Sequence, residues 1–176
     1  TRGDADLENF ILIGMPGAGK STVGKILAEN IGYNFMDTDD LIIDKYQKSL
    51  MDLIEEMGVE GFIRAEGEIL ETVNVDRHVI ATGGSVIYSE KGMAHLQSLG
   101  KVVYLCYTEE DIAARVGDLT TRGVVCRNCK SFRELFDERR PYYEKYADIV
   151  VHLEHASFSR SIQRVLKTIE SYVHKI

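Results

Sequence analysis

The chain has 176 residues, 44% of them hydrophobic and 28% charged, which fits one globular domain with an ordinary soluble balance. Its net charge of −7 argues against nonspecific binding to DNA or RNA, because such binding needs a positive surface that displaces counterions. Every apolar run is far shorter than the ~18 residues of a membrane-spanning helix. We therefore expect a cytoplasmic protein, a monomer, that has neither a nucleic acid nor a membrane as its partner.

Short apolar runs alternate with longer amphipathic stretches along the chain. The apolar runs predict strands at 10–14, in a short segment ending at Met36, and at 78–82, 102–106 and 149–153. The amphipathic stretches predict helices at 20–30, 40–72 with a break near Gly58, 89–98, 109–116, 131–145 and 157–173. This alternation predicts an α/β fold with three layers, α/β/α, around a five-stranded parallel sheet. Residues 1–8 are expected to be disordered or extraneous, and 9–176 to form a single domain.

The stretch GMPGAGKST, residues 14–22, joins the first predicted strand to the first predicted helix. Its glycines let backbone N–H groups approach phosphate oxygens, and the helix adds its positive amino-terminal end. Lys20 suits contacts with the β- and γ-phosphates, and Ser21 offers a hydroxyl to Mg²⁺. The residues expected to hold the nucleotide are Gly14, Gly17, Ala18, Gly19, Lys20, Ser21 and Thr22. The loop predicts a nucleoside triphosphate site and leaves the reaction open.

The rest of the sequence narrows the class of protein that owns this loop. GTPases read their base with an NKxD motif, which this sequence lacks, and motor ATPases are generally larger. A short chain with a second acidic motif soon after the loop is typical of a small-molecule or nucleotide kinase. A nucleotide acceptor would need a second set of basic residues, and none stands out.

The second motif is an aspartate pair in FMDTDD, residues 35–40. Asp37 and Asp39 are two residues apart, so that at the end of an extended strand both carboxylates point the same way. One could hold Mg²⁺ through water, and the other could accept the proton of an attacking hydroxyl. The alternative is helix capping by Asp39 or Asp40, because aspartate is a good N-cap residue.

With these two motifs and ERRPYYEKYAD, residues 138–148, the sequence resembles the shikimate kinases from about Asn9 to its C-terminus. The resemblance implies a nucleoside-monophosphate-kinase-like P-loop fold, with ATP and Mg²⁺ as cofactors. It implies transfer of the γ-phosphoryl group to a hydroxyl of shikimate, a step of aromatic amino acid biosynthesis. Asp37 corresponds to the family's metal-side aspartate, which acts with Ser21, and Asp39 to the aspartate that contacts the substrate hydroxyl.

The resemblance also implies roles for three arginines. Arg115 matches an arginine that packs on adenine, and Arg122, seven residues later, matches an arginine of the lid, expected at 117–130. Arg139 matches an arginine that binds the substrate carboxylate. Because arginine stays charged and holds two oxygens in a fixed fork, it suits both the transferring phosphoryl group and a carboxylate. The expected catalytic residues are Lys20, Asp39 and Arg122.

Three departures from the family pattern fall on the acceptor side. Ile63 in GVEGFIRAE takes the position of a second substrate-carboxylate arginine, and Arg64 lies about 100° further round a helix. Gly83-Gly84-Ser85 replaces a triple glycine, and RGVV replaces R-P-L-L in the lid. The residues expected to bind the acceptor are Asp39, Arg64, Gly83, Gly84, Ser85 and Arg139.

These departures leave the acceptor open. Another small hydroxylated acid or amino acid, such as quinate or homoserine, would also place a carboxylate on Arg139. An ATP-binding switch module would explain an intact nucleotide site beside an altered acceptor site, although such a module has no use for Asp39 or Arg139.

Three cysteines, Cys106, Cys126 and Cys129, give no disulfide framework. Cys126 and Cys129 have the spacing of zinc ligands, but the chain offers no second pair for the four ligands that structural zinc needs. We expect free, incidental thiols there, with a redox lock of the lid as the alternative.

Overall fold

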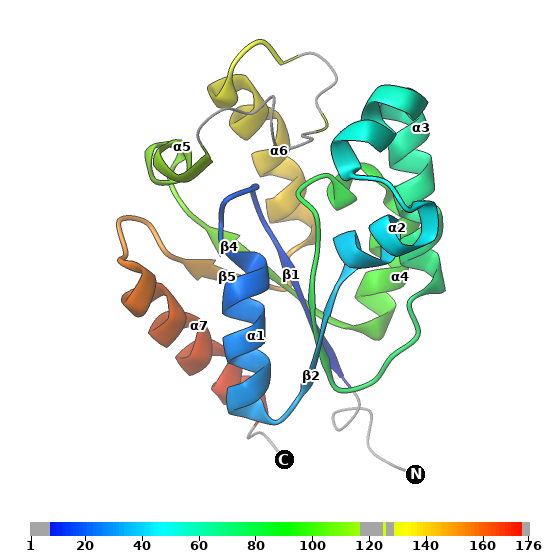
Figure 1. Ribbon diagram of the computed structural model, residues 1–176. Helices are drawn as coiled ribbons and strands as arrows, with labels where there is room; N and C mark the ends of the chain where they lie inside the picture. Colours follow the sequence, from blue (N-terminus) through cyan, green and yellow to red (C-terminus); the bar gives the residue numbers. More distant parts are fainter. Residues whose placement is uncertain (1–7, 117–124, 126–128, 174–176) are drawn as a thin grey trace.

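The computed structural model describes residues 8–116, 125 and 129–173. Its strands, in chain order, are β1 (Asn9–Ile13), β2 (Asn34–Asp37), β3 (His78–Ala81), β4 (Gly100–Cys106) and β5 (Ile149–His152). They form one sheet in the order β2-β3-β1-β4-β5, and each neighbouring pair is parallel (Figure 1). The predicted five-stranded parallel sheet is thereby confirmed.

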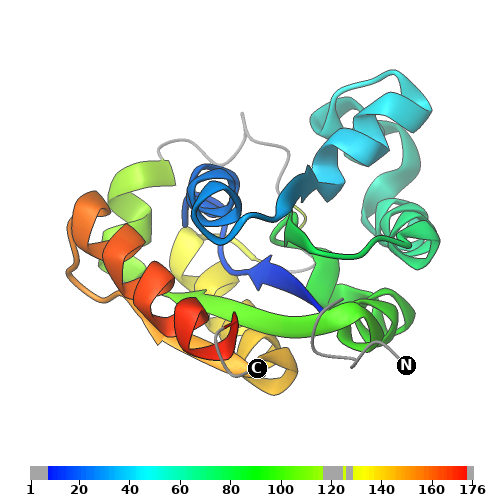
Figure 2. The same cartoon turned by 90° about the horizontal axis from the view of Figure 1, so that it is seen from below.

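The helices are α1 (Lys20–Ile31), α2 (Thr38–Tyr46), α3 (Leu50–Thr72), α4 (Glu90–Leu99), α5 (Glu109–Val116), α6 (Phe132–Tyr146) and α7 (Phe158–Val173), with a short 3₁₀ helix at Val86–Tyr88. Helices α1 and α7 cover one face of the sheet, and α4 and α6 cover the other (Figure 2). The three-layer prediction is confirmed. No helix of the described ranges is long and apolar enough to cross a membrane.

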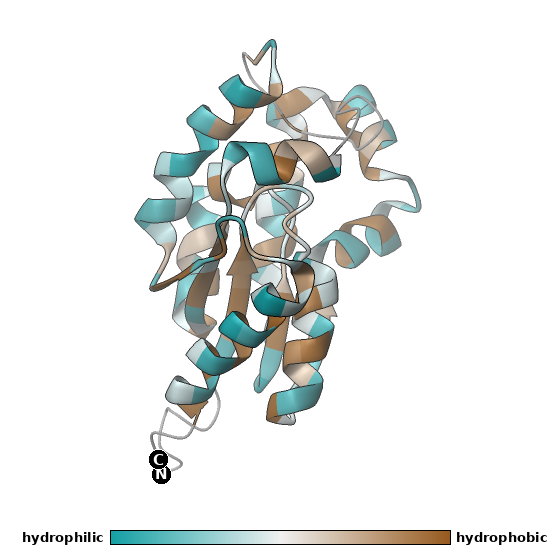
Figure 3. Ribbon diagram, turned by 90° about the vertical axis from the view of Figure 1, so that its left-hand side faces the viewer, coloured by the Kyte–Doolittle hydropathy of each residue, from teal (hydrophilic) through white to brown (hydrophobic). Residues whose placement is uncertain are grey.

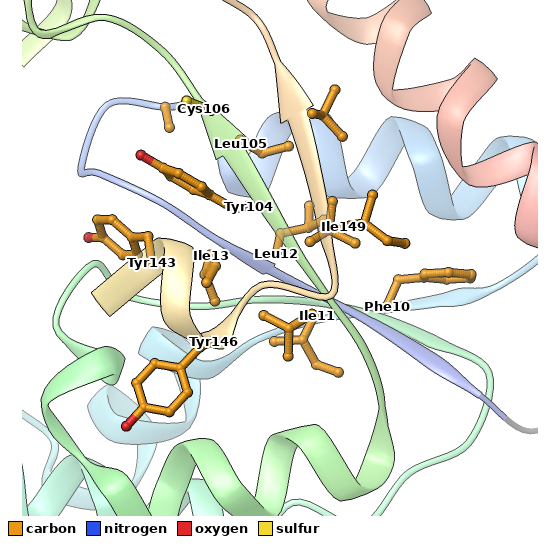
Figure 4. Packing of buried hydrophobic residues seen from close by; sticks show 14 of the residues in the cluster. Phe10, Ile11, Leu12, Ile13, Tyr104, Leu105, Cys106, Tyr143, Tyr146 and Ile149 are labelled. Atoms are coloured by element: carbon orange, nitrogen blue, oxygen red, sulfur yellow. The ribbon is translucent and has the colours of Figure 1, made fainter. Parts of the chain in front are cut away.

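The core lies on both faces of the central strand. All five residues of β1 are buried, which explains the unbroken apolar run from Phe10 to Ile13, and the helices turn their polar sides outward (Figure 3). On one face Tyr104 of β4 stacks on Tyr143 of α6, with ring centroids 5.2 Å apart (Figure 4). This contact fixes α6 against the sheet and so positions Arg139, one turn before Tyr143.

The single helical stretch predicted at 40–72 is wrong in one respect. Two helices, α2 and α3, occupy it, because Gln47 adopts a left-handed conformation with φ of 54° and ends α2. Ser49 then caps α3 by accepting a hydrogen bond of 3.1 Å from the backbone N–H of Asp52. The predicted break at Gly58 is present as a kink inside α3, where φ is 74°. The lid expected at 117–130 falls mostly outside the described residues.

Candidate active site

The loop between β1 and α1 lies at the carboxyl end of the sheet. Gly17 and Gly19 have φ angles of 84° and 80°, and Gly14 has a φ of 151°, all of which strain an L-residue with a side chain. A Cβ atom at Gly14 would also lie 3.1 Å from the carbonyl oxygen of Leu105. Glycine at these three positions therefore lets the loop adopt its backbone conformation and, at Gly14, lie close against Leu105 of β4.

Lys20 opens α1 and turns its side chain back into the loop. Its Nζ donates hydrogen bonds of 2.6 Å to the carbonyl oxygen of Gly14 and 2.8 Å to that of Met15. Burial lowers the pKa of Lys20 to about 8, although the carboxylate of Asp39 opposes that shift. The ammonium group is thus desolvated and oriented by the loop, as a group that meets phosphate oxygens should be.

Ser21 and Asp37 form the second element of this end of the site. The hydroxyl of Ser21 donates a hydrogen bond to Asp37 Oδ2, while Asp37 Oδ1 accepts one of 2.9 Å from the backbone N–H of Asp39. Asp37 is thereby the N-cap of α2, so the alternative of a cap at Asp39 or Asp40 is wrong. Two adjacent oxygen ligands of this kind fit a hard cation such as Mg²⁺.

Asp39 lies in the first turn of α2 and not at a strand end, so its carboxylate is aimed by helix geometry. It lines two cavities that share a wall. The larger, about 360 Å³, is walled by the loop from Pro16 to Thr22 and by 82–84. The smaller, about 80 Å³, is lined by residues that include Glu66, Ser85 and Arg139. Asp39 therefore stands between a space beside Lys20 and a space beside Arg139.

Close packing at the shared wall depends on two glycines. A Cβ at Gly83 would lie 2.7 Å from Asp39 Oδ1, and one at Gly84 would lie 2.5 Å from Arg139 Nη1. Burial raises the pKa of Asp39 to about 6, and the neighbouring carboxylate of Asp37 adds to the rise. A carboxylate that titrates near neutrality is suited to accept a proton from a hydroxyl group.

Arg139 is 1% exposed and reaches the smaller cavity from α6. Its Nη2 donates a hydrogen bond of 2.7 Å to the carbonyl oxygen of Val125, and its guanidinium lies 5.6 Å from the ring centroid of Tyr88. The Nε atom is buried and has no hydrogen-bond partner among the described residues. Among the described residues that line this cavity, Arg139 is the one cation, so an anionic group of a ligand would face it.

Comparison with known proteins agrees with this geometry. The family model described as shikimate kinase matches residues 16–170. The chain belongs to the shikimate kinase family. A shikimate kinase of Francisella tularensis subsp. holarctica is 35% identical over 162 residues, which are 90% of this chain and 92% of that one. The human protein Threonine synthase-like 1 is 33% identical over 94% of this chain and 23% of its own length.

A solved structure shows that the similarity extends to the fold. The shikimate kinase from Acinetobacter baumannii, determined in complex with shikimate, superposes with a TM-score of 0.82 at 30% identity and covers 96% of both chains. As a member of the shikimate kinase family, this chain is an ATP-dependent phosphotransferase that acts on an alcohol group.

Glu66 is a site residue that the sequence reasoning did not nominate. It is 1% exposed, and its Oε1 accepts a hydrogen bond of 2.9 Å from the hydroxyl of Ser85. Its Oε2 has no partner within the described part of the chain, and the residue lines the smaller cavity. Burial raises the pKa of Glu66 to about 8, although the hydrogen bond from Ser85 acts to lower that pKa. The available signal was a carboxylate four residues after Phe62, on the same face of a helix.

Neither Ile63, at the altered family position, nor its neighbour Arg64 lines the smaller cavity. Ile63 is buried in an apolar cluster with Leu53, Phe62 and Val125, among others. Arg64 is exposed on α3 and does not line the cavity, so the structure does not bring it to the acceptor side as expected. The helical turn of about 100° between neighbours separates the two side chains.

Arg115 lines neither of the two cavities. Arg115, in the last turn of α5, stacks on Tyr107 with its guanidinium 4.4 Å from the ring centroid. Arg122 is outside the described residues.

The cysteine expectation needs a correction. Cys129 is disulfide-bonded, so its expected free thiol is wrong, whereas Cys106 is free.

A further hollow of about 460 Å³ lies at the opposite, amino end of the sheet, beside Asn9, Gly100 and Asp148. It is larger than either cavity above, but it is remote from the P-loop and from Asp39. In parallel α/β sheets ligands bind beyond the carboxyl ends of the strands, so we place the site at the two smaller cavities.

Proposed function

We propose that the chain transfers the γ-phosphoryl group of ATP to a hydroxyl group of shikimate. The observation that carries this proposal is the position of Asp39, which faces a cavity beside Lys20 and a second cavity beside Arg139. A group that accepts a proton from the attacking hydroxyl must lie between the phosphoryl donor and the acceptor. Membership of the shikimate kinase family and the shikimate complex of the Acinetobacter baumannii relative support the choice of acceptor.

At the nucleotide end, the chain's own groups supply charge and orientation. Lys20 and the backbone N–H groups of the loop would contact the phosphate oxygens, and Ser21 and Asp37 would hold Mg²⁺. Mg²⁺, when bound, neutralises negative charge on the phosphates. Arg115 on the adenine and Arg122 over the transferring group remain the family's expectation for this chain.

At the acceptor end, Arg139 would bind the carboxylate and Asp39 would hold the reacting hydroxyl. With a pKa of about 6, Asp39 is mostly ionised at neutral pH and can accept the proton as the new O–P bond forms. Ser85 and Glu66 complete the wall of the cavity and offer hydrogen bonds to the other polar groups of the acceptor.

A second acceptor class is favoured by one observation. The smaller cavity sets two acidic residues, Asp39 and Glu66, against the single cation Arg139. A hydroxylated amino acid such as homoserine would place its ammonium group near the carboxylate of Asp39 and the mostly protonated carboxyl group of Glu66, and its own carboxylate on Arg139. The switch-module alternative lacks such support, because it gives these buried charges no role.

A coupled ADP-release assay with shikimate, quinate, homoserine or no acceptor tests the proposal. We expect release that depends on shikimate and falls by ~10²–10⁴-fold in Asp39→Asn. The matched control is Asp40→Asn, the exposed neighbour in the same motif, which should retain activity. ADP release that depends on homoserine or quinate, and not on shikimate, would show that the protein is a kinase with a different acceptor. Release that no acceptor increases would overturn the proposal in favour of an ATPase switch.

A further inference from the structure

A second group of chemically reactive side chains lies at the outer edge of the sheet. Cys106 ends β4, His152 ends β5, and the two residues are paired in register. Glu154 follows two residues after His152. Cys106 lies on the face of β4 that also carries Tyr104 (Figure 4). None of the three lines either cavity of the kinase site.

The side chains converge on one point. Glu154 Oε1 lies 3.6 Å from Cys106 Sγ and 3.1 Å from His152 Nδ1. One ligand atom from each of the three residues lies within 4.8 Å of the other two. Ligands of a tetrahedral zinc ion, at about 2.0–2.3 Å from the metal, are roughly 3.3–3.6 Å from one another. One ion could therefore bind all three with side-chain shifts of about an ångström.

The main chain around this group is held in place. The backbone N–H of Leu153 donates a hydrogen bond of 2.8 Å to the carbonyl oxygen of Cys106, which ties the turn after β5 to β4. Arg164 of α7 donates one of 3.1 Å to the carbonyl oxygen of His152. Because the three ligands start from such an anchored frame, a metal would not have to order the backbone before it binds.

The group is also open on one side. Cys106 is 8% exposed, whereas the side chains of His152 and Glu154 are 70% and 34% exposed. An ion at this point would keep contact with solvent, so water can supply a fourth ligand. Three protein ligands and one open position are the arrangement of exchangeable and catalytic zinc sites, in contrast to closed structural ones.

We propose that Cys106, His152 and Glu154 bind a divalent transition-metal ion of the zinc class, with water in the fourth position. A sulfur, an imidazole nitrogen and a carboxylate oxygen form a borderline-soft set that favours Zn²⁺ over Mg²⁺. The site is therefore distinct in chemistry from the oxygen pair of Ser21 and Asp37. As the sulfur–metal bond forms, the thiol proton passes to the buffer.

The expected consequence is local order at the turn after β5. His155, next to Glu154, donates its backbone N–H to Asp111 Oδ2 at 2.9 Å. Asp111 belongs to α5, the helix that carries Arg115. A metal on Glu154 would therefore stiffen the link between β5 and α5. The competing possibility is a metal-free network in which the thiol and the imidazole donate to one carboxylate.

Cobalt titration of the full chain separates these possibilities. The protein is freed of metal with a chelator, with its disulfide left intact, and titrated with Co²⁺ in excess Mg²⁺, which occupies oxygen-only sites. We expect about one equivalent of Co²⁺ to bind, with a thiolate-to-cobalt charge-transfer band and the intense visible bands of tetrahedral Co²⁺, and Zn²⁺ to displace it. Absence of the charge-transfer band would overturn the proposal.

Variants assign the ligands. Cys106→Ser should abolish the charge-transfer band, and His152→Ala should weaken Co²⁺ binding by about tenfold or more, since losing even an indirect partner of a ligand costs that much. His152 is exposed, so this variant keeps the fold if Cys106→Ser does not. The matched control is His155→Ala, three residues on, which should bind Co²⁺ like the parent. A band that survives Cys106→Ser and is lost in Cys129→Ser, or equal weakening by His155→Ala, would contradict the site.

Discussion

The two ends of the kinase site are built in different ways. At the nucleotide end, the loop glycines, Lys20 and Ser21 are consecutive or nearly so in the sequence. The shape of this end is set mainly by the backbone conformation of the loop. At the acceptor end, Asp39, Glu66, Ser85 and Arg139 come from four distant segments and meet around one cavity. The nucleotide end is therefore a local property of the chain, and the acceptor end is a property of the whole fold. Substitutions should act differently on the two ends.

The largest effect should come from Lys20→Met. We expect turnover to fall by ~10³-fold or more, because the variant removes a buried, oriented charge at the phosphates. Lys25→Met, an exposed lysine on the same helix, is the control and should leave ADP release unchanged. Circular dichroism checks that both variants fold. Near-normal turnover in Lys20→Met would show that this loop is not where the phosphates of ATP bind.

Arg139→Ala should act on the acceptor end alone. Loss of a charge-assisted contact predicts a fall in kcat/KM for shikimate of ~10–100-fold, mainly as a higher KM for shikimate with an unchanged KM for ATP. Arg140→Ala is the control, because Arg140 is exposed and pairs with Glu144 at 2.9 Å. An effect on the KM for ATP, or an equal effect of Arg140→Ala, would show that the two ends are not separable in this way.

The pH dependence of kcat/KM should report one group from each end. Asp39 must be ionised to accept a proton, so kcat/KM should fall about tenfold per pH unit below its pKa of about 6. Lys20 must be protonated, so kcat/KM should also fall above about pH 8. Initial rates at subsaturating shikimate between pH 5 and 9, with the buffer ions matched, measure both limbs. A flat profile below about pH 7 would exclude Asp39 as the proton acceptor.

The smallest effect should come from Ser85→Ala. This variant removes the hydrogen bond to the buried carboxyl group of Glu66, which should cost about 1 kcal/mol of folding stability at neutral pH. Urea unfolding measures the loss, with Ser98→Ala on the exposed side of α4 as the control. No difference between the two variants would mean that Ser85 and Glu66 are not coupled.

The same contrast decides what the sequence could predict. The phosphate loop is marked by short-range sequence signals: an apolar strand, then closely spaced glycines, then a lysine. The sequence therefore places the loop and the helix after it correctly. The strand–helix alternation likewise predicted the sheet. The break between α2 and α3 was missed because Gln47 in a left-handed conformation has no strong sequence signal.

The acceptor end depends on contacts that no local pattern records. Whether Arg64 or Ile63 faces the cavity depends on how α3 packs, and that is set by the apolar cluster around Leu53 and Phe62. Glu66 reads as an ordinary surface residue of an amphipathic helix until its neighbours bury it. The N-cap of α2 is a further example. Asp37, Asp39 and Asp40 are all good N-cap residues by type, and only the structure shows that Asp37 accepts the capping hydrogen bond.

The hydrogen bond from Arg139 to the carbonyl oxygen of Val125 has a consequence for any carboxylate that enters the cavity. A guanidinium has five N–H groups, and this bond uses only one of them, on Nη2, while the Nε–H has no partner among the described residues. An arriving carboxylate can therefore pair with the remaining N–H groups while the bond to Val125 keeps the side chain in place. Because the conformation of Arg139 is fixed before the acceptor enters, less side-chain entropy is lost when the acceptor binds.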